Sequence, residues 1–391
     1  MPIHLPGGFH PLRAALLALT LVVVHSGAAA RTWLVGPGGA PMALSRALAE
    51  AADGDTVEVL PGTYKGEGGV IGQKRLTIRG LEPRPVIEGG DRLTEDKAAL
   101  VVRDGDVTIE NLEFRGHRAP DANGAGIRFE KGRLTVRRSR FADNEMGLLT
   151  ANFGDAELVI EDSEFVQAPH RVGGLPHLLY VGRIASMRIT GSRFHGGFEG
   201  HLIKSRARRS FIGYNLIVDG PGGGASYEID LPNGGEAVVI GNIIGQSADT
   251  QNPVMIAYGA EGKAWEHNQL LLSHNTFVSD ALLAWFLRSW PERLTPDTQI
   301  RAVNNLTVGA GIFTFGSAGS FDGNWPALAR SLVDPASFAF ELDRDAWLRG
   351  RADDPATLAG PQAVPTAEFT LPIGTRPLTP PAAWSPGALQ R

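Results

Sequence analysis

The chain has 391 residues, 43% of them hydrophobic and 20% charged, so it is long enough to bury a large core. Its net charge of −5 is mild, which excludes a general binder of nucleic acid or of an anionic membrane surface. It contains 49 glycines, 26 prolines and no cysteine, which indicates many turns, little helix and no disulfide bonds.

The first 30 residues have the layout of a secretory signal peptide. Arg13 precedes an apolar run from Ala14 to Val24, and small residues follow from Ser26 to Ala30. The apolar run is short for a helix that spans a bilayer. We therefore expect cleavage after Ala30, export to the periplasm or the medium, and no membrane insertion of the mature chain.

The mature chain begins with a short helix and a strand. Residues 44–52 are rich in alanine and leucine and predict a helix, and residues 54–64 follow as turn, strand and turn. A helix at this place can cap the open first coil of a repeat protein, which otherwise exposes core and sheet edges.

A short strand motif then recurs along the chain. Apolar residues alternate around an Asn or Ser marker, which falls at positions 111, 139, 163, 192, 215, 242, 275 and 305. A repeat of about 25 residues holds three short strands and three bends, the size of one β-helix coil, and stacked amide markers can bond from coil to coil. We predict an all-β fold, a single-stranded right-handed parallel β-helix (a solenoid), over residues 31–316.

Two other repeat folds have units of similar length. A propeller blade needs about four strands per repeat, and a leucine-rich repeat needs a leucine consensus that this chain lacks. From residue 317 to residue 391 the repeat is lost and proline and alanine dominate. We expect an irregular C-terminal segment that packs on or beyond the last coils, with an extended or loosely ordered final stretch from residue 365.

Two segments resemble known secreted β-helical proteins that act on polysaccharides. The opening ALAEAADGDTVEVLPGTY, residues 47–64, is similar to the opening of pectate lyases, of the alginate lyase and chondroitinase B family, and of alginate epimerases. Residues 199–206, EGHLIKSR, followed by YNLI at 214–217, resemble the alginate lyase and chondroitinase B segment. That resemblance implies that Lys204 is the base that removes the proton α to a uronate carboxylate, and that Glu199 binds calcium.

The same comparison shows departures from the family pattern. The next coil reads IDLPNG at residues 229–234, so Asp230 stands where the family has a catalytic arginine. Gly197 falls at the position of the second calcium-binding acid. The resemblance in the site covers about 15 residues, and we keep calcium as the one possible cofactor.

Stacking the coils in register predicts a file of outward side chains. We take Ile127, Leu149, Leu179, Ile203 and Ile229 as equivalent inward residues, so that the next residues point outward: Arg128, Thr150, Tyr180, Lys204 and Asp230. The bend three residues earlier places His177, His201 and Tyr227 together, and Arg206 lies two residues after Lys204. The candidate catalytic residues are Lys204, Tyr180, His201 and Asp230. The candidate substrate-binding residues are Arg206, His177, Tyr227, Glu228, Asn233 and Arg208.

This set has the groups that glycan cleavage requires. For β-elimination Lys204 can be the base if Arg206 and partial burial depress its pKa, and Tyr180 or His201 can be the acid. For hydrolysis Glu228 and Asp230 offer a carboxylate pair. A structural reading stays open, in which Lys204 and Asp230 form a plain cross-strand ion pair and the histidines a satisfied ladder. The coil after Asp230 carries an insertion with Glu261 and Trp265. We expect this insertion either to form one wall of a groove or to pack in the core.

From these observations we expect an exported polysaccharide lyase that cleaves an acidic glycan in a lateral groove of the β-helix. The alternatives are a glycoside hydrolase or uronate epimerase on the same surface, and a non-catalytic polysaccharide-binding or envelope protein. We expect an anionic polysaccharide as partner, no nucleic acid, and a monomer.

Overall fold

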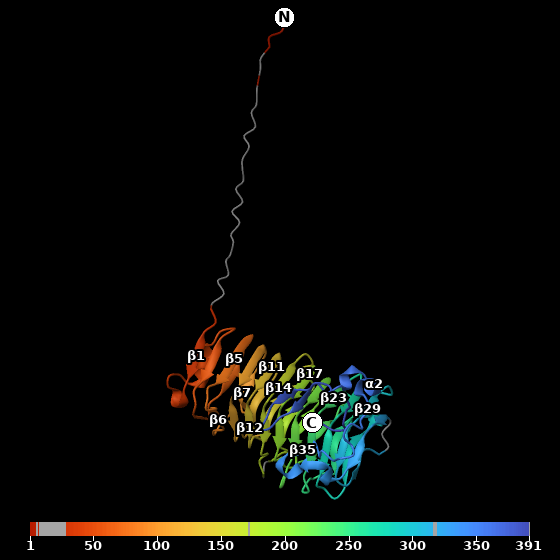
Figure 1. Cartoon of the computed structure of the whole chain (residues 1–391). Coiled ribbons are helices and arrows are strands. Elements are labelled where there is room, and N and C mark those ends of the chain that lie inside the picture. Colours follow the sequence, from red (N-terminus) through yellow and green to blue (C-terminus); the bar gives the residue numbers. More distant parts are fainter. Residues whose placement is uncertain (5–6, 8–28, 171–172, 316–318, 391) are drawn as a thin grey trace.

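The computed structural model describes residues 1–4, 7, 29–170, 173–315 and 319–390 (Figure 1). The apolar run of the expected signal peptide lies outside the described residues. In the part of the chain that is described, no helix combines the length and the apolar character that a membrane crossing needs.

Three long parallel sheets wind around one core, which confirms the parallel β-solenoid (Figure 1). We call them sheets A, B and C, in the order in which each coil visits them. Sheet A has twelve strands: β1 Thr32–Val35, β2 Thr56–Val59, β5 Arg75–Gly80, β8 Asp106–Glu110, β11 Arg133–Arg137, β14 Glu157–Glu161, β17 Ser186–Thr190, β20 Arg209–Gly213, β23 Glu236–Ile240, β26 Gln269–Ser273, β29 Gln299–Val303 and β32 Ser320–Asp322. Sheet B has eleven: β3 Thr63–Lys65, β6 Val86–Glu88, β9 Glu113–Arg115, β12 Arg140–Ala142, β15 Glu164–Val166, β18 Arg193–His195, β21 Leu216–Val218, β24 Ile243–Gln246, β27 Thr276–Ser279, β30 Leu306–Val308 and β33 Trp325–Ala327. Sheet C has ten: β4 Gly69–Ile71, β7 Ala98–Val102, β10 Ala125–Phe129, β13 Met146–Thr150, β16 His177–Val181, β19 Ile203–Ser205, β22 Ile229–Leu231, β25 Val254–Tyr258, β28 Ala284–Ser289 and β31 Gly311–Ile312.

A few elements lie outside the three sheets. The expected capping helix is α1 (Leu44–Glu50), which buries Leu44, Ala47 and Leu48 at the first coils. The other short elements are α2 Pro355–Ala359, β34 Leu332–Asp334, β35 Ala339–Leu342, β36 Ala367–Phe369, β37 Thr375–Pro377 and five single-turn 3-10 helices, Pro37–Gly39, Pro291–Arg293, Ala329–Ser331, Pro335–Ser337 and Pro361–Ala363.

The inward side chains form continuous stacks because successive coils repeat the same pattern. In sheet B four phenylalanines, Phe114, Phe141, Phe165 and Phe194, lie face to face with ring centroids 5.2, 4.5 and 4.8 Å apart. Such offset stacks add to the burial of apolar area, which is the main stabilising contribution of the core.

The bend between sheets A and B carries the polar ladder that the sequence predicts. The backbone N–H of Ser192 donates to Asn215 Oδ1 (2.9 Å), Asn215 to Asn242, Asn242 to Asn275 and Asn275 to Asn305. The ladder runs one coil further than expected, to Asn324. At its start the prediction is wrong by one residue, because Leu112 and not Asn111 pairs with Ser139.

A left-handed residue precedes each ladder position. Its φ lies between 45° and 63° at Asn111, Arg138, Asp162, Gly191, Tyr214, Gly241, His274 and Asn304. This conformation is uncommon outside glycine, so its recurrence shows that the bend geometry overrides local preference.

The C-terminal segment returns along the outside of the solenoid (Figure 1). Strands β32 and β33 still extend sheets A and B beyond residue 316. Phe340, Phe369 and Leu389 then pack with Leu306 and other outward residues of sheet B. The stretch from residue 365 is docked and not loosely ordered, since the Gly387 N–H donates to the Asn304 carbonyl (2.9 Å).

Candidate functional site

The outer face of sheet C holds the expected file of polar residues, with one correction. Strand pairing places Tyr180 beside Lys204 and Lys204 beside Asp230, as predicted. In the preceding coil Leu148 is the inward residue, and Leu149, not Thr150, pairs with Tyr180. Leu149 is buried in a small apolar patch with Met146. The file of polar residues therefore consists of Tyr180, Lys204 and Asp230, on β16, β19 and β22.

A carboxylate is held between two cations at the centre of this face. Lys204 Nζ lies 3.1 Å from Glu261 Oε1, and an Arg206 terminal nitrogen lies 2.6 Å from Glu261 Oε2. The Lys204 side chain is 10% exposed, whereas that of Glu261 is 46% exposed. We call Lys204 and Arg206 the carboxylate clamp. Glu261 belongs to the loop after β25, two coils beyond Lys204, and its carboxylate is the open side of the arrangement.

Tyr180 and Asn233 hold the Arg206 side of the clamp. Arg206 Nε donates to the Tyr180 oxygen (3.0 Å), and its terminal nitrogen also donates to Asn233 Oδ1. The Trp265 indole N–H donates to the Arg206 carbonyl (3.1 Å), which ties the loop to the same strand. Trp265 is half-buried on this loop.

Asp230 supports the Lys204 side from below. Its Oδ2 lies 2.9 Å from Lys204 Nζ and 3.3 Å from His201 Nε2, and its side chain is only 3% exposed. Burial raises the pKa of Asp230, but His201 and Lys204 outweigh burial and the net shift is downward. Asp230 is thus a buried, ionised partner and does not face the solvent.

Three rings stack at the bend before these strands, as the register predicts. His177 and His201 have centroids 4.8 Å apart, and His201 and Tyr227 also lie 4.8 Å apart. The His201 backbone N–H donates to His177 Nδ1 (2.9 Å), while burial and then the charges of His201 and Lys204 hold the pKa of His177 well below its usual value. The stack positions His201 against Asp230.

The expectation of a depressed pKa for Lys204 is wrong. Burial alone lowers the pKa of the Lys204 ammonium, but Asp230 and Glu261 outweigh burial and the net shift is upward. In this structure Lys204 is a protonated cation. It binds anions and cannot accept a proton while both carboxylates are in place.

Three other candidates lie away from the clamp. Glu228 is buried inside the coil, where burial and then nearby Asp219 raise its pKa well above the usual value, so it forms no surface carboxylate pair with Asp230. Arg208 is exposed at the bend after β19. Glu199 is exposed at a bend before β19.

Of the two acids that the resemblance implies for calcium, this chain has only Glu199. Within the described part of the chain, no group of three or more His, Cys, Asp or Glu side chains could hold a metal ion. Gly197, the position of the expected second acid, offers no side-chain ligand, and we route no chemical step through a metal.

The fold and this face define a parallel β-solenoid protein with a lateral carboxylate clamp. Among solved structures, the chain is similar to the crystal structure of pectate lyase Pel9A, with a TM-score of 0.60 and 15% identity over 92% of this chain and 96% of that chain. It also matches an alginate lyase from Paenibacillus sp. str. FPU-7, with a TM-score of 0.43 and 14% identity over 76% of this chain and 99% of that one. A PL6 family alginate lyase, AlyGC, matches at a TM-score of 0.39 and 16% identity, over 76% of this chain and 52% of that one.

These likenesses concern the fold. No family model matches the sequence, and no curated protein matches it. The site must therefore be interpreted from its own geometry.

Proposed function

We propose that this protein is a polysaccharide lyase that cleaves an acidic glycan by β-elimination on the outer face of sheet C. One observation carries the proposal: the clamp of Lys204 and Arg206 already holds a carboxylate, that of Glu261. A uronate carboxylate has the same charge and shape and can take its place. The structural neighbours named above include a pectate lyase with the same fold, which supports a polysaccharide substrate.

The clamp supplies the electrostatic part of the reaction. When the proton α to the uronate carboxylate leaves, negative charge develops on that carboxylate, and Lys204 and Arg206 stabilise it. Asp230 and the ring stack hold Lys204 in position. Lys204 is thus assigned to binding and charge stabilisation, in place of the role of base.

Tyr180 is assigned to proton transfer. Arg206 fixes its oxygen beside the clamp at 3.0 Å. In the proposed step the Tyr180 hydroxyl first releases its proton to solvent. The Tyr180 oxygen then accepts the α proton, the carbon–carbon double bond forms, and the glycosidic carbon–oxygen bond breaks. The Tyr180 hydroxyl then gives its proton to the departing sugar oxygen, so the enzyme returns to its starting state.

The arrangement favours elimination over hydrolysis. A glycosidase needs one protonated and one ionised carboxyl group on the same face. Glu228 is inside the coil, and cationic partners outweigh burial to lower the pKa of both Asp230 and Glu261. An epimerase shares the first proton transfer, so the product distinguishes it.

The test is the appearance of an unsaturated product. The mature chain is incubated with polygalacturonate, alginate and a glucuronate-containing glycan, and ultraviolet absorbance of the new double bond is followed. We expect an increase with one of them and a loss of at least about 100-fold in kcat for Tyr180→Phe, which removes only the hydroxyl. Lys263→Ala, an exposed lysine of the same loop, should keep full activity.

Other outcomes reject the proposal in different ways. Reducing ends without the absorbance would identify a hydrolase, inverted uronates without chain cleavage would identify an epimerase, and binding without any product would identify a binding protein. Full activity of Tyr180→Phe would overturn the assignment of proton transfer. We also propose export to the periplasm or medium, which N-terminal sequencing of the protein from fractionated cells tests directly.

A further inference from the structure

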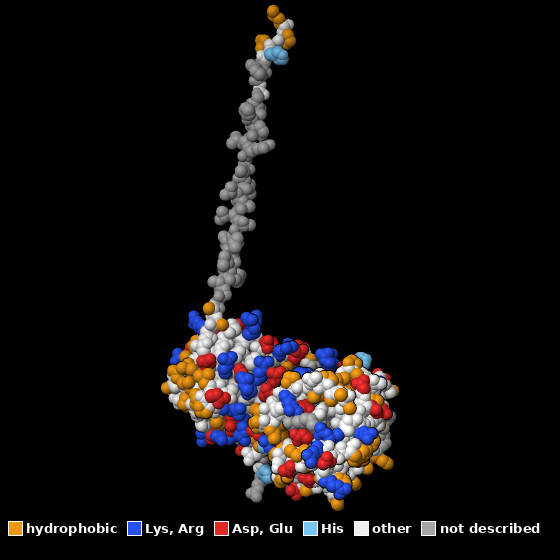
Figure 2. Space-filling view, in the orientation of Figure 1, with side chains coloured by type: hydrophobic (Ala, Val, Ile, Leu, Met, Phe, Trp, Pro, Cys, Tyr) orange, Lys and Arg blue, Asp and Glu red, His pale blue; other side chains and the backbone are white. Residues whose placement is uncertain are grey.

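The two halves of the outer face of sheet A differ in whether their arginines form ion pairs. In the N-terminal half, outward arginines pair with glutamates of the neighbouring coil: Arg79 with Glu110 (3.3 Å), Arg137 with Glu161 (2.7 Å), and Arg133 with Glu157. Figure 2 shows this half as interspersed blue and red side chains. These three arginines are already neutralised.

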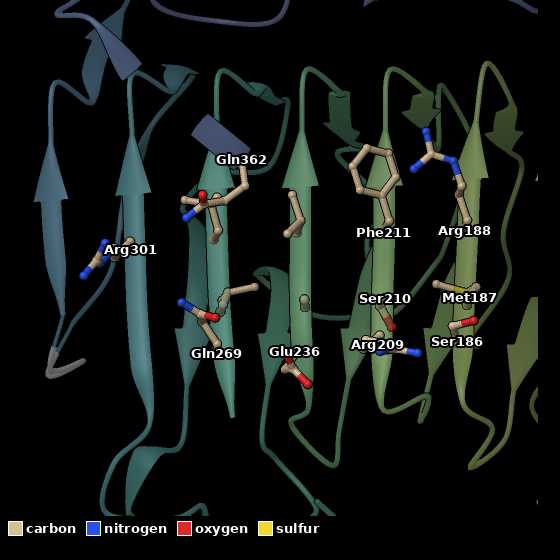
Figure 3. A pocket seen from close by; sticks show the side chains of 14 residues that line it. Ser186, Met187, Arg188, Arg209, Ser210, Phe211, Glu236, Gln269, Arg301 and Gln362 are labelled. Carbon is tan, nitrogen blue, oxygen red and sulfur yellow. The ribbon is translucent and has the colours of Figure 1, made fainter. Parts of the chain in front are cut away.

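The C-terminal half carries arginines without such partners. Arg188, Arg209 and Arg301 are exposed, and none of the three forms an ion pair with a described residue. They line a cavity of about 450 Å³ whose one acidic lining residue is Glu236 (Figure 3). The cavity therefore has an excess of positive charge, in contrast to the paired half of the same sheet.

The cavity is elongated along the solenoid axis. Strand pairing puts Arg188, Phe211, Val238, Leu271 and Arg301 in one file on five successive strands. The two terminal arginines are four coil steps apart, about 19 Å. Figure 3 shows Arg188 beside Phe211 at one end and Arg301 at the other. The floor residues between them are apolar, and the C-terminal segment covers one of them, because Leu271 is 4% exposed and packs with Ala359 and Ala363.

Polar groups edge this floor. Ser186, Arg209, Glu236 and Gln269 form a second, parallel row on the same strands, and Gln362 of the C-terminal segment overhangs the floor (Figure 3). The Arg188 guanidinium lies 4.1 Å from the centroid of the Phe211 ring, which fixes the direction of its charge. The site is thus a trough with an arginine at each end, of which Arg188 is held by the Phe211 ring, and with hydrogen-bonding groups along its side.

We propose that this trough on sheet A is a second binding site for an acidic oligosaccharide, separate from the clamp on sheet C. An extended sugar chain presents apolar ring faces to such a floor, hydroxyls to Ser186, Gln269 and Gln362, and carboxylates to arginine forks. Its repeat along the chain is close to the coil spacing, so successive sugars can meet successive strands. The proposal rests on the proposed function only for the choice of an acidic glycan.

The experiment separates the two sites by variants. In a Lys204→Ala/Arg206→Ala background, which disables the clamp, binding of a galacturonate tetrasaccharide and a mannuronate tetrasaccharide is measured by calorimetry, with maltotetraose as the neutral probe. We expect one saturable site for an acidic tetrasaccharide, weakened at least tenfold by Arg188→Ala/Arg301→Ala and by raised salt. The matched control is Arg133→Ala/Arg137→Ala, which removes the same charge from the paired half of the sheet and should leave binding unchanged.

Each result decides between the two sites. Equal affinity in the Arg188/Arg301 and Arg133/Arg137 variants, no binding in the clamp-disabled background, or equal binding of maltotetraose would overturn the trough. Because the arginines of sheet A are exposed, the same four substitutions can be made in the wild-type chain if the clamp variant does not fold. A failure of the proposed lyase activity appears as absence of ultraviolet product and leaves this binding measurement intact.

Discussion

At the scale of single residues, Glu261 has two opposing effects on the proposed site. It neutralises the clamp in the free protein, and it must leave before a substrate carboxylate can bind. Its 46% exposure and its position on a loop allow that exchange, whereas Asp230 is locked beneath Lys204. Glu261 therefore competes with substrate from within the chain.

We predict that Glu261→Gln strengthens substrate binding. The amide keeps the shape of the side chain but gives up the charge that pairs with Lys204 and Arg206. Because the Glu261 carboxylate is about half exposed, the gain is about 1 kcal/mol, or roughly a fivefold lower KM. Steady-state kinetics on the active glycan measures it. Glu266→Gln, an exposed acid of the same loop, is the matched control, and an unchanged KM in Glu261→Gln would contradict competition.

At the scale of elements, the amide ladder joins one coil to the next. Asn242 Oδ1 accepts from the Asn215 N–H (3.0 Å), and Asn242 Nδ2 donates to the Ile212 carbonyl (2.8 Å) and to Asn275 Oδ1 (3.0 Å). All of these groups are buried, so each lost bond leaves a polar atom without water.

We predict that Asn242→Ala lowers the free energy of unfolding by about 2 to 4 kcal/mol, since several buried partners become unsatisfied. Asn242→Ser should cost less, because Ser139, Ser163 and Ser192 occupy the same place in earlier coils. Urea denaturation followed by circular dichroism measures both. Equal destabilisation by the two substitutions would show that the ladder depends on the amide itself.

The sequence predicts an element where the same residue pattern recurs from coil to coil. It does not predict a feature that depends on a contact between distant segments. Alternation and stacked markers fixed the coils and brought His177, His201 and Tyr227 together. In β13 two consecutive leucines left the inward residue ambiguous, and the register slipped by one. The contact of Glu261 with Lys204 could not be derived, because this loop carboxylate lies 57 residues further along the chain.

At the scale of the whole molecule, the C-terminal segment binds the outside of the solenoid across two sheets. His274 lies at this junction: it is fully buried, its ring lies 5.1 Å from that of Trp384, and the neighbouring Ser273 hydroxyl donates to the Ala363 carbonyl (2.6 Å). Burial lowers the pKa of His274 to about 3. Folding here therefore requires a neutral imidazole.

We predict that this histidine makes stability fall with acidification. Below about pH 6.5 the unfolded chain binds a proton at His274, while the folded chain binds it only near pH 3, so the free energy of unfolding decreases as pH falls through that window. Between pH 7.5 and pH 5 the contribution is about 2 kcal/mol. In His274→Asn, which tolerates the left-handed φ of 48°, stability should fall by that much less.

Urea titrations at the two pH values give the comparison. His267→Asn, which removes an exposed histidine, is the control and should show the wild-type pH dependence. Identical pH dependence in His274→Asn and the wild type would contradict the assignment.

The repeated bend, a left-handed residue followed by a ladder residue, has a consequence for how such a molecule can change in length. From Ser139 to Asn305 each coil offers a side-chain oxygen to the coil before it and a backbone N–H to the coil after it. A duplicated coil inserted between two others would therefore find matching bonds on both of its faces, without adjustment elsewhere. Growth by whole coils would lengthen the clamp face and the trough together, by about 4.8 Å for each addition. Gene duplication can therefore change the length over which this protein contacts a polymer, in equal steps of one coil.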